Sequence, residues 1–244
     1  MVDAAVLSAV SAVSALSAVS PAAARGPGAV NPDGCSVELF ALLPAAGEAG
    51  LVHRSIPAGA SVLDLGCGTG RIAAPLAALG HEVVAVDESA EMLALVHDVR
   101  PVRAHIQDLR LPRTFDAVLL ASHLLNTPGA DDRQALLATC RAHVSAGGQV
   151  LIQWHPAQWF DALRAGTTHE GELGPVRARL AVHAIDAGLL DAEVSYRAGR
   201  QQWVQPFFAR RLGEQQLGEE LTAAGLGFGS WLDTGHGWFS ATPV

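Results

Sequence analysis

From residue 61 onward, short apolar runs take turns with segments in which apolar positions recur at helical spacing. Short apolar runs predict buried strands over 61–65, 82–86, 102–106, 115–121 and 149–154. Between them, apolar positions spaced three and four apart predict helices over 72–79, 90–98 and 133–144. Strands that alternate with helices indicate a parallel sheet covered by helices on both faces. Ligands of such sheets bind outside the carboxyl ends of the strands, where the strand order reverses.

Other patterns flank this core. Helical spacing starts at Ser36, stops at Pro44 and resumes around Leu51 and Val52. Three extended stretches, 176–185, 189–197 and 201–210, are joined by turn sequences and predict an antiparallel insertion over 175–211. A helix over 214–224 and two strands over 227–232 and 238–242 follow. The chain therefore predicts an α/β, Rossmann-like, doubly wound seven-stranded sheet with an antiparallel β insertion before the last helix and a C-terminal β-hairpin.

The first thirty residues are rich in Ala, Ser and Val, with apolar positions on one helical face. A signal peptide is the competing interpretation, but this stretch has Asp3, no positive charge before Arg25 and many serines. Prolines and glycines between 27 and 34 separate it from the rest. We expect a mobile or loosely docked arm over 1–34 and one domain over 35–244.

Composition narrows the class of protein. Half of the residues are apolar and 16% are charged, as in a folded globular protein. The formal net charge is −8 and no arginine cluster forms a basic face, which argues against a nucleic-acid partner. No apolar run is long enough to span a membrane. Cys35, Cys67 and Cys140 lack the spacing of a disulfide framework or a metal site, so we expect a cytoplasmic protein without a metal.

The sequence VLDLGCGTGR, residues 62–71, joins the first predicted strand to the following helix. Its glycines at 66, 68 and 70 let the backbone turn sharply and let a ligand lie against it. A dinucleotide fingerprint would need its third glycine at 71, where Arg71 stands. A phosphate-binding P-loop needs a lysine, and the chain has none. Both phosphate-binding interpretations are therefore weakened.

Two acids complete the motif. Asp64 precedes the turn, where a carboxylate would repel a pyrophosphate but can bind an ammonium group. Asp87 ends the second predicted strand and can accept both hydroxyls of a ribose, although it could also cap the next helix. S-adenosylmethionine (AdoMet) has an ammonium group and a ribose but no phosphate. The pair of acids therefore favours AdoMet as the cofactor.

On these motifs the chain resembles class I AdoMet-dependent methyltransferases of the small-molecule type, over about residues 36–155 and again in the last thirty residues. The resemblance implies that the amino-acid part of AdoMet lies on the turn formed by Gly66, Cys67, Gly68 and Gly70, shortly after Asp64. Arg71 either touches the AdoMet carboxylate or faces solvent.

Further cofactor residues follow from the same resemblance. It implies that Asp87, next to Glu88, holds the ribose, and that Met92 packs on adenine or belongs to the core. The segment Gln107, Asp108 and Leu109 matches the place where an acid takes the adenine amino group and a backbone amide meets the ring. Asp108 could instead be only a turn residue.

Catalysis is expected after the fourth and fifth strands. Ser122 and His123 follow the fourth strand, where the family meets the methyl donor and acceptor. His155 follows the fifth and is the first candidate for a general base, since a histidine near its unperturbed pKa suits proton removal at neutral pH. His123 is the second candidate. Each could instead be a hydrogen-bonded histidine in a loop, and a neutral amine acceptor could react by positioning alone.

The acceptor is narrowed by two absences. The sequence SHLL after the fourth strand differs from the Asn/Asp-Pro-Pro-Tyr/Phe of amino-methylating DNA and protein enzymes, and no cysteine follows a proline as in cytosine C5 enzymes. The insertion is similar to that of glycine and amino-sugar N-methyltransferases, which implies a roof over the acceptor or subunit contacts in a homodimer. Aromatic residues for such a roof are Trp159, Phe160, Tyr196, Trp203, Phe207 and Phe208.

We therefore expect an enzyme that transfers a methyl group from AdoMet to an O or N atom of a small molecule in bacterial specialised metabolism. An AdoMet-binding protein of the same fold that catalyses a non-methylating reaction, such as cyclisation, is the alternative. A non-enzymatic binding protein is a third interpretation.

Overall fold

The computed structural model describes residues 24–31 and 34–244, which fall into two compact units. The parallel-sheet unit comprises Ala45–Ala121, Gly129–Trp154 and Glu214–Val244. The antiparallel unit comprises the described residues up to Pro44, with Ser122–Pro128 and His155–Gly213. The expected arm lies, for residues 1–23 and 32–33, outside the described residues. Within the described ranges, none of the helices is both long and apolar enough to cross a membrane.

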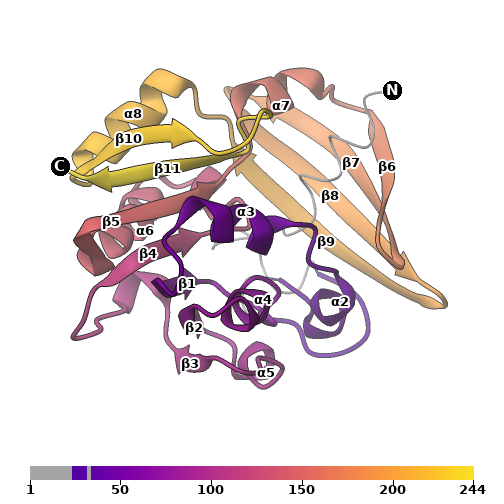
Figure 1. Ribbon diagram of the computed structural model, residues 1–244. Helices are drawn as coiled ribbons and strands as arrows, with labels where there is room; N and C mark the ends of the chain where they lie inside the picture. Colours follow the sequence, from indigo (N-terminus) through magenta and orange to yellow (C-terminus); the bar gives the residue numbers. More distant parts are fainter. Residues whose placement is uncertain (1–23, 32–33) are drawn as a thin grey trace. The chain divides into compact units, whose positions relative to one another are not determined.

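The parallel-sheet unit contains seven strands in the order β10-β11-β5-β4-β1-β2-β3 (Figure 1). They are β1 (Ser61–Leu65), β2 (Glu82–Asp87), β3 (Arg100–Arg103), β4 (Phe115–Leu120), β5 (Val144–Gln153), β10 (Leu226–Trp231) and β11 (Trp238–Pro243). All neighbours pair in parallel except β11, which runs antiparallel to β5 and to β10. The predicted fold class and the C-terminal hairpin are confirmed. The strand order reverses between β1 and β4, which marks the ligand-binding edge.

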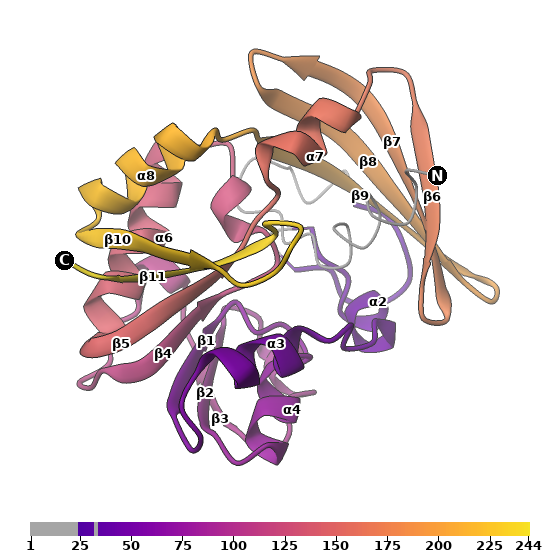
Figure 2. The ribbon, with the colours of Figure 1, turned by 45° about the horizontal axis from the view of Figure 1, so that its top comes forward.

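Helices cover both faces of this sheet, because its strands are apolar on both sides. The helices are α3 (Glu48–Ser55), α4 (Ala73–Ala78), α5 (Ala90–Leu93), α6 (Ala130–His143) and α8 (Glu214–Ala223). One buried cluster joins apolar residues of α3 and α4 to alternate strand residues such as Val62, Val83 and Leu119. Figure 2 shows α6 and α8 together on the opposite face.

Three predicted elements of this unit are wrong in extent. The strand expected over 149–154 begins at Val144, directly after α6. The helix expected over 90–98 ends at Leu93, because Leu95 is 39% exposed and Asp98 has a left-handed φ of 62°. The strand expected over 102–106 covers Arg100–Arg103 instead, and a 3-10 turn, η2, follows over Ile106–Asp108. As the edge strand of the sheet, β3 has a ladder partner on one side only, so its pairing with β2 sets its bounds.

The antiparallel unit is built on a four-stranded sheet, β6-β7-β8-β9. Its strands are β6 (Thr168–Leu173), β7 (Val176–Asp186), β8 (Leu189–Ala198) and β9 (Gln201–Arg210), and its helical elements are α2 (Val37–Leu42), η3 (Leu124–Asn126) and α7 (Ala157–Ala162). The expected hairpin turn at 186–188 forms, with φ of 45° at Ala187 and 78° at Gly188. The sequence patterns missed β6, which is polar except at its last residue, and α7.

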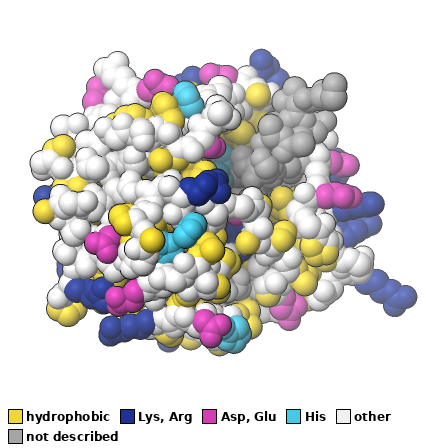
Figure 3. Space-filling model, viewed as in Figure 1, with side chains coloured by type: hydrophobic (Ala, Val, Ile, Leu, Met, Phe, Trp, Pro, Cys, Tyr) yellow, Lys and Arg dark blue, Asp and Glu magenta, His cyan; other side chains and the backbone are white. Residues whose placement is uncertain are grey.

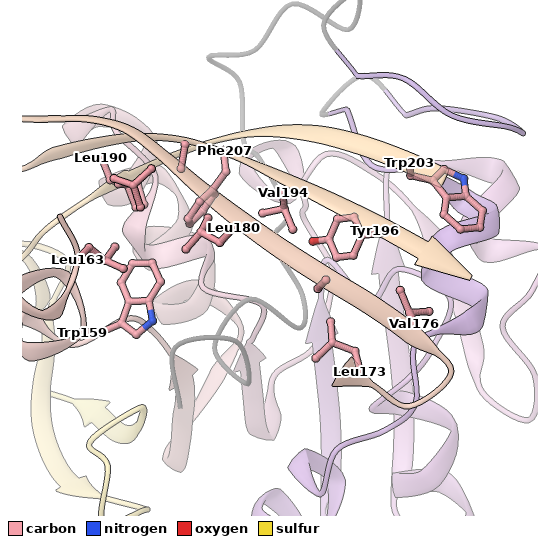
Figure 4. Packing of buried hydrophobic residues seen from close by; sticks show 14 of the residues in the cluster. Trp159, Leu163, Leu173, Val176, Leu180, Leu190, Val194, Tyr196, Trp203 and Phe207 are labelled. Carbon is pink, nitrogen blue, oxygen red and sulfur yellow. The ribbon is translucent and has the colours of Figure 1, made fainter. Parts of the chain in front are cut away.

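One face of this sheet is buried. Alternate residues of β7, β8 and β9 point into an apolar cluster that α2 and α7 also enter. In Figure 4, Trp159, Leu163, Leu190 and Phe207 group at one end of the cluster, and Tyr196 and Trp203 lie at the other. The other face carries mostly polar side chains on β7 and β8, which are exposed on β7 and largely half-buried on β8. The difference between the two faces explains the alternation in the sequence.

The segment before α2 is hydrogen-bonded to β9. Arg25 and Val204 exchange two backbone hydrogen bonds, of 2.9 and 2.7 Å, and the Trp203 indole N–H donates to the Pro27 carbonyl at 3.0 Å. This described part of the expected arm is therefore ordered against the antiparallel sheet.

Candidate active site

The glycine turn follows β1 at the ligand-binding edge of the parallel sheet. The backbone N–H groups of Gly66 and Cys67 both donate to the Val86 carbonyl at 2.9 Å, which fixes the turn to β2. Gly68 has φ of 54°, in the left-handed region that side chains rarely adopt. A Cβ added there would have no described atom within 4 Å, so the space above the turn is open. The turn therefore forms a cradle that a side chain would fill.

Asp64 lies just before this cradle and is 2% exposed. Its Oδ2 atom has no hydrogen-bond partner in the described part of the chain. Burial raises the pKa of this carboxyl to about 7, with Arg71 opposing the shift. A buried carboxylate that lacks a hydrogen bond on one oxygen fits a cationic ligand, and the ammonium group of AdoMet is such a partner.

Arg71 forms an ion pair with Glu48, whose Oε1 accepts from Nη1 at 2.6 Å. The Arg71 side chain is only 9% exposed. This excludes the interpretation in which Arg71 simply faces solvent. The sequence analysis did not identify Glu48, because the two residues lie far apart in the chain and no local motif links them.

Asp87 connects the tip of β2 to the glycine turn. Its Oδ2 accepts from the Gly68 N–H at 2.8 Å and its Oδ1 accepts from the Ser89 N–H at 2.9 Å. Ser89, rather than Asp87, caps α5, because its hydroxyl accepts from the Met92 N–H at 3.1 Å. Each carboxylate oxygen can accept more than one hydrogen bond, so these contacts are compatible with a ribose.

The other expected cofactor residues follow β2 and β3. The Oε2 atom of Glu88 lies 2.5 Å from the Nδ1 atom of His105. Met92 and Leu109 are buried, Gln107 is half-buried, and Asp108 is exposed at the end of η2. The expected cofactor residues thus lie at the carboxyl ends of three neighbouring strands. The end of β1 is followed by the glycine turn with Cys67 and Arg71, and Asp64 lies within the last two residues of β1. The strand β2 ends at Asp87, which Glu88 follows, and residues 107–109 follow β3. These roles stay predictions.

Ser122 and His123 belong to the antiparallel unit, as does His155. Ser122 and His123 have φ of 58° and 59°, two consecutive non-glycine residues in the left-handed region. Such strain costs on the order of 1–3 kcal/mol per residue and concentrates at functional sites. It marks the loop after β4 as a place where the position of a side chain matters.

The His155 ring lies in a stack of three rings. Its centroid is 3.7 Å from that of His123, at 8° between planes, and 4.0 Å from that of Trp159, at 14°. Two rings this close cannot share one face of an imidazole, so His123 and Trp159 cover opposite faces. Phe160 and Phe207 meet the His155 ring edge-on. We call His123, His155 and Trp159 the ring stack.

The expectation that His155 has an ordinary pKa is wrong. Its side chain is fully buried, and burial together with His123 holds the pKa of the imidazole well below its usual value. Both ring nitrogens are buried without a hydrogen-bond partner among the described residues. His155 is therefore a neutral imidazole, and neither its N–H nor its ring lone pair has a hydrogen-bond partner among the described residues.

The expected roof aromatics divide into two groups. Trp159, Phe160, Phe207, Tyr196 and Trp203 all lie in the apolar cluster, but only the first three contact the His155 ring. Phe208 is half-buried and lies outside this cluster. The sequence analysis missed Asn126, whose buried amide binds the backbone of His155. Its only local signal is a polar residue directly after Leu124 and Leu125.

Comparisons with known proteins bear on this arrangement. The family described as "Methyltransferase domain" matches residues 62–148. The dTDP-3-amino-3,6-dideoxy-alpha-D-glucopyranose N,N-dimethyltransferase of Streptomyces fradiae is 31% identical over 223 residues, which cover 82% of this chain and 83% of that protein. The chain belongs to the class I AdoMet-dependent methyltransferases.

Solved structures extend the likeness to the whole fold. The CcbJ methyltransferase of Streptomyces caelestis aligns with a TM-score of 0.69 at 25% identity, covering 84% of this chain and 92% of that one. The sugar N-methyltransferase KedS8 of Streptoalloteichus sp ATCC 53650 shares the fold, with a TM-score of 0.68 at 20% identity over 90% of this chain and 98% of its own. The methyltransferase uses AdoMet as its cofactor, and the relatives do not favour the cyclisation alternative.

Proposed function

We propose that this methyltransferase transfers the AdoMet methyl group to an amine nitrogen of a small molecule. The observation that carries the proposal is the neutral, buried His155, whose two ring nitrogens have no hydrogen-bond partner among the described residues. An imidazole in that state can accept a hydrogen bond from an acceptor N–H group and thereby orient the nitrogen lone pair.

An amine nitrogen is favoured over a hydroxyl oxygen as the methyl acceptor because it needs no strong base. A hydroxyl must lose its proton to become a strong nucleophile, and a histidine whose pKa is well below its usual value is a weak base for that step. A neutral amine already carries a lone pair and needs only position and the exclusion of water. The proton of the methylated ammonium can leave to solvent afterwards. His155 thus positions the acceptor, with His123 stacked on its ring.

The cofactor half of the proposal uses the residues of the parallel-sheet unit. When bound, AdoMet supplies an activated methyl group on a sulfonium. Asp64 accepts from its ammonium group and Asp87 from its ribose, while Gly68 leaves room for the ligand. The remaining contacts from this unit come from Gly66, Cys67, Gly70, Arg71, Glu88, Met92, Gln107, Asp108 and Leu109. Ser122, in the antiparallel unit, stays a further candidate.

The proposed acceptor class is supported by a relative whose name gives a dTDP-linked amino sugar as its substrate. An amino sugar or similar small amine of bacterial specialised metabolism fits the aromatic surroundings of His155, because the apolar face of a sugar packs well on rings. A nucleic-acid acceptor is disfavoured by the charge of −8. On the face seen in Figure 3, arginine side chains lie among acidic and neutral ones rather than in one basic surface.

We also propose a cytoplasmic enzyme that forms a homodimer. The exposed face of the antiparallel sheet carries paired charges of both signs, Glu172 with Arg177 and Glu170 with Arg179, each 3.5 Å apart. Such a face is complementary to a second copy of itself in an isologous contact. Sedimentation at several protein concentrations tests this state.

A substrate screen tests the proposed function. Purified enzyme with methyl-labelled AdoMet is offered nucleotide-linked amino sugars, the same sugars with hydroxyl in place of amine, peptides and RNA. Labelled product and an equimolar amount of S-adenosylhomocysteine are expected only with the nucleotide-linked amino sugars. Label transferred only to hydroxyl acceptors, or only to macromolecules, contradicts the proposal.

A further inference from the structure

The side chain of Asn126 is 2% exposed and uses its amide in three hydrogen bonds to the main chain. Its Oδ1 accepts from the His155 N–H at 2.7 Å. Its Nδ2 donates to the His155 carbonyl at 3.2 Å and to the Arg210 carbonyl at 3.0 Å. Both backbone polar groups of His155 are therefore held by one amide.

These bonds join three segments of the antiparallel unit that are far apart in the chain. Asn126 ends η3, whose first residue follows the left-handed His123, and its N–H donates to the His123 carbonyl at 2.9 Å. His155 begins the segment that leads into α7 and Trp159. Arg210 is the last residue of β9, the strand that also carries Phe207.

We propose that Asn126 is a positioning residue that holds the His123 and His155 rings in register. The inference rests on the proposed function, in which His155 orients the acceptor nitrogen. The ring of His155 is placed by its own backbone, and the ring of His123 by the loop that Asn126 closes. The Asn126 side chain thus fixes the positions of both imidazole rings, whose centroids lie 3.7 Å apart.

The chemistry of the amide is matched to this task. The His155 backbone offers one donor and one acceptor to this side chain, and only a carboxamide of this size supplies an acceptor and two donors together. Aspartate would keep the bond to the His155 N–H and lose both bonds to carbonyls. The rings would then be free to shift, and a displacement on the order of 1 Å lowers turnover by about a hundredfold.

The decisive variant is Asn126→Asp, measured in the full-length enzyme. We expect kcat to fall about tenfold to a hundredfold while the AdoMet dissociation constant from calorimetry stays within about threefold. The second readout is the NMR shift of the His155 ring protons, which the stacked Trp159 and His123 rings move upfield. That shift is expected to shrink in the variant, whether or not the acceptor is known.

A destabilised control separates positioning from loss of stability. Leu217→Ala removes a buried side chain from α8, outside the proposed machinery, and should lower Tm while leaving kcat and the His155 shift unchanged. If Asn126→Asp does not fold, Asn126→Gln is measured in its place. Unchanged ring shifts in the folded variant, or equal losses in kcat and AdoMet affinity, overturn the inference. Full turnover by a folded His155→Phe enzyme would instead remove the role proposed for His155, and the ring shifts would still judge Asn126.

Discussion

The glycine turn and the ring stack differ in how their geometry is made. In the turn, backbone bonds from neighbouring residues to Val86 and Asp87 define the shape, and a left-handed glycine keeps the surface open. In the stack, side chains from separate segments define the shape, and the rings are buried. In the proposed function, cofactor recognition therefore depends mainly on local backbone geometry, whereas acceptor positioning depends on tertiary packing.

Gly68→Ala should have the largest effect. The added Cβ enters the space proposed for AdoMet, so affinity should fall by about a thousandfold, which corresponds to ~4 kcal/mol. Calorimetry with S-adenosylhomocysteine measures the loss. The matched control is Gly199→Ala, because Gly199 has nearly the same φ, 56°, and equally open space, but lies in the β8–β9 turn. Equal loss of affinity in both variants would show that strain, and not the cradle, is responsible.

His155→Phe should have the next largest effect. Phenylalanine keeps an aromatic ring between His123 and Trp159 but removes both ring nitrogens, so kcat should fall by about a hundredfold with little change in AdoMet affinity. Tm should stay level or rise, since two unsatisfied buried polar atoms are removed. His183→Phe, at an exposed position of β7, is the control and should leave kcat unchanged. A His155→Phe enzyme with normal kcat would contradict the role proposed for the two ring nitrogens of His155.

The smallest effect is expected at Asp64, where AdoMet affinity should change with pH in one direction. With a pKa of about 7 in the ligand-free protein, the carboxyl is protonated below that pH and ionised above it. The ammonium of AdoMet needs the ionised form, so affinity should fall about tenfold for each pH unit below 7 and level off above it. Asp64→Asn should bind more weakly and show no such slope. Calorimetry at intervals of about half a pH unit, from about pH 5.5 to about 8.5, measures the AdoMet affinity of both proteins. A flat profile for the natural protein would exclude an ammonium at Asp64.

Sequence patterns predicted the fold well where periodicity was strong. The strand over 61–65 has the expected position because it is a short apolar run that is buried on both faces. The three long strands of the insertion have the expected positions because their apolar residues alternate, as the burial of one face imposes. The prediction failed at edge elements. Polar β6 has no alternating signal, and η2 replaces the end of an expected strand. Such segments take their structure from neighbours rather than from their own pattern.

In the candidate site, too, features with a local pattern were predictable and features that depend on distant residues were not. The glycine spacing and the two acids were readable from residues 62–87, since each acts through its place at the end of a strand. The raised pKa of Asp64 and the lowered pKa of His155 were not readable, because each depends on burial by distant residues. Asn126 and Glu48 were missed for the same reason.

By itself the sequence determined the parallel sheet, the glycine turn and the argument against a phosphate-binding loop. These depend on local periodicity, on backbone freedom at glycine and on the missing lysine. Only the tertiary structure decided that His155 is neutral, stacked between two rings and held by Asn126. The physical reason is that desolvation and hydrogen bonding depend on which residues become neighbours in space, and residues 123, 126, 155 and 210 meet only when the chain folds.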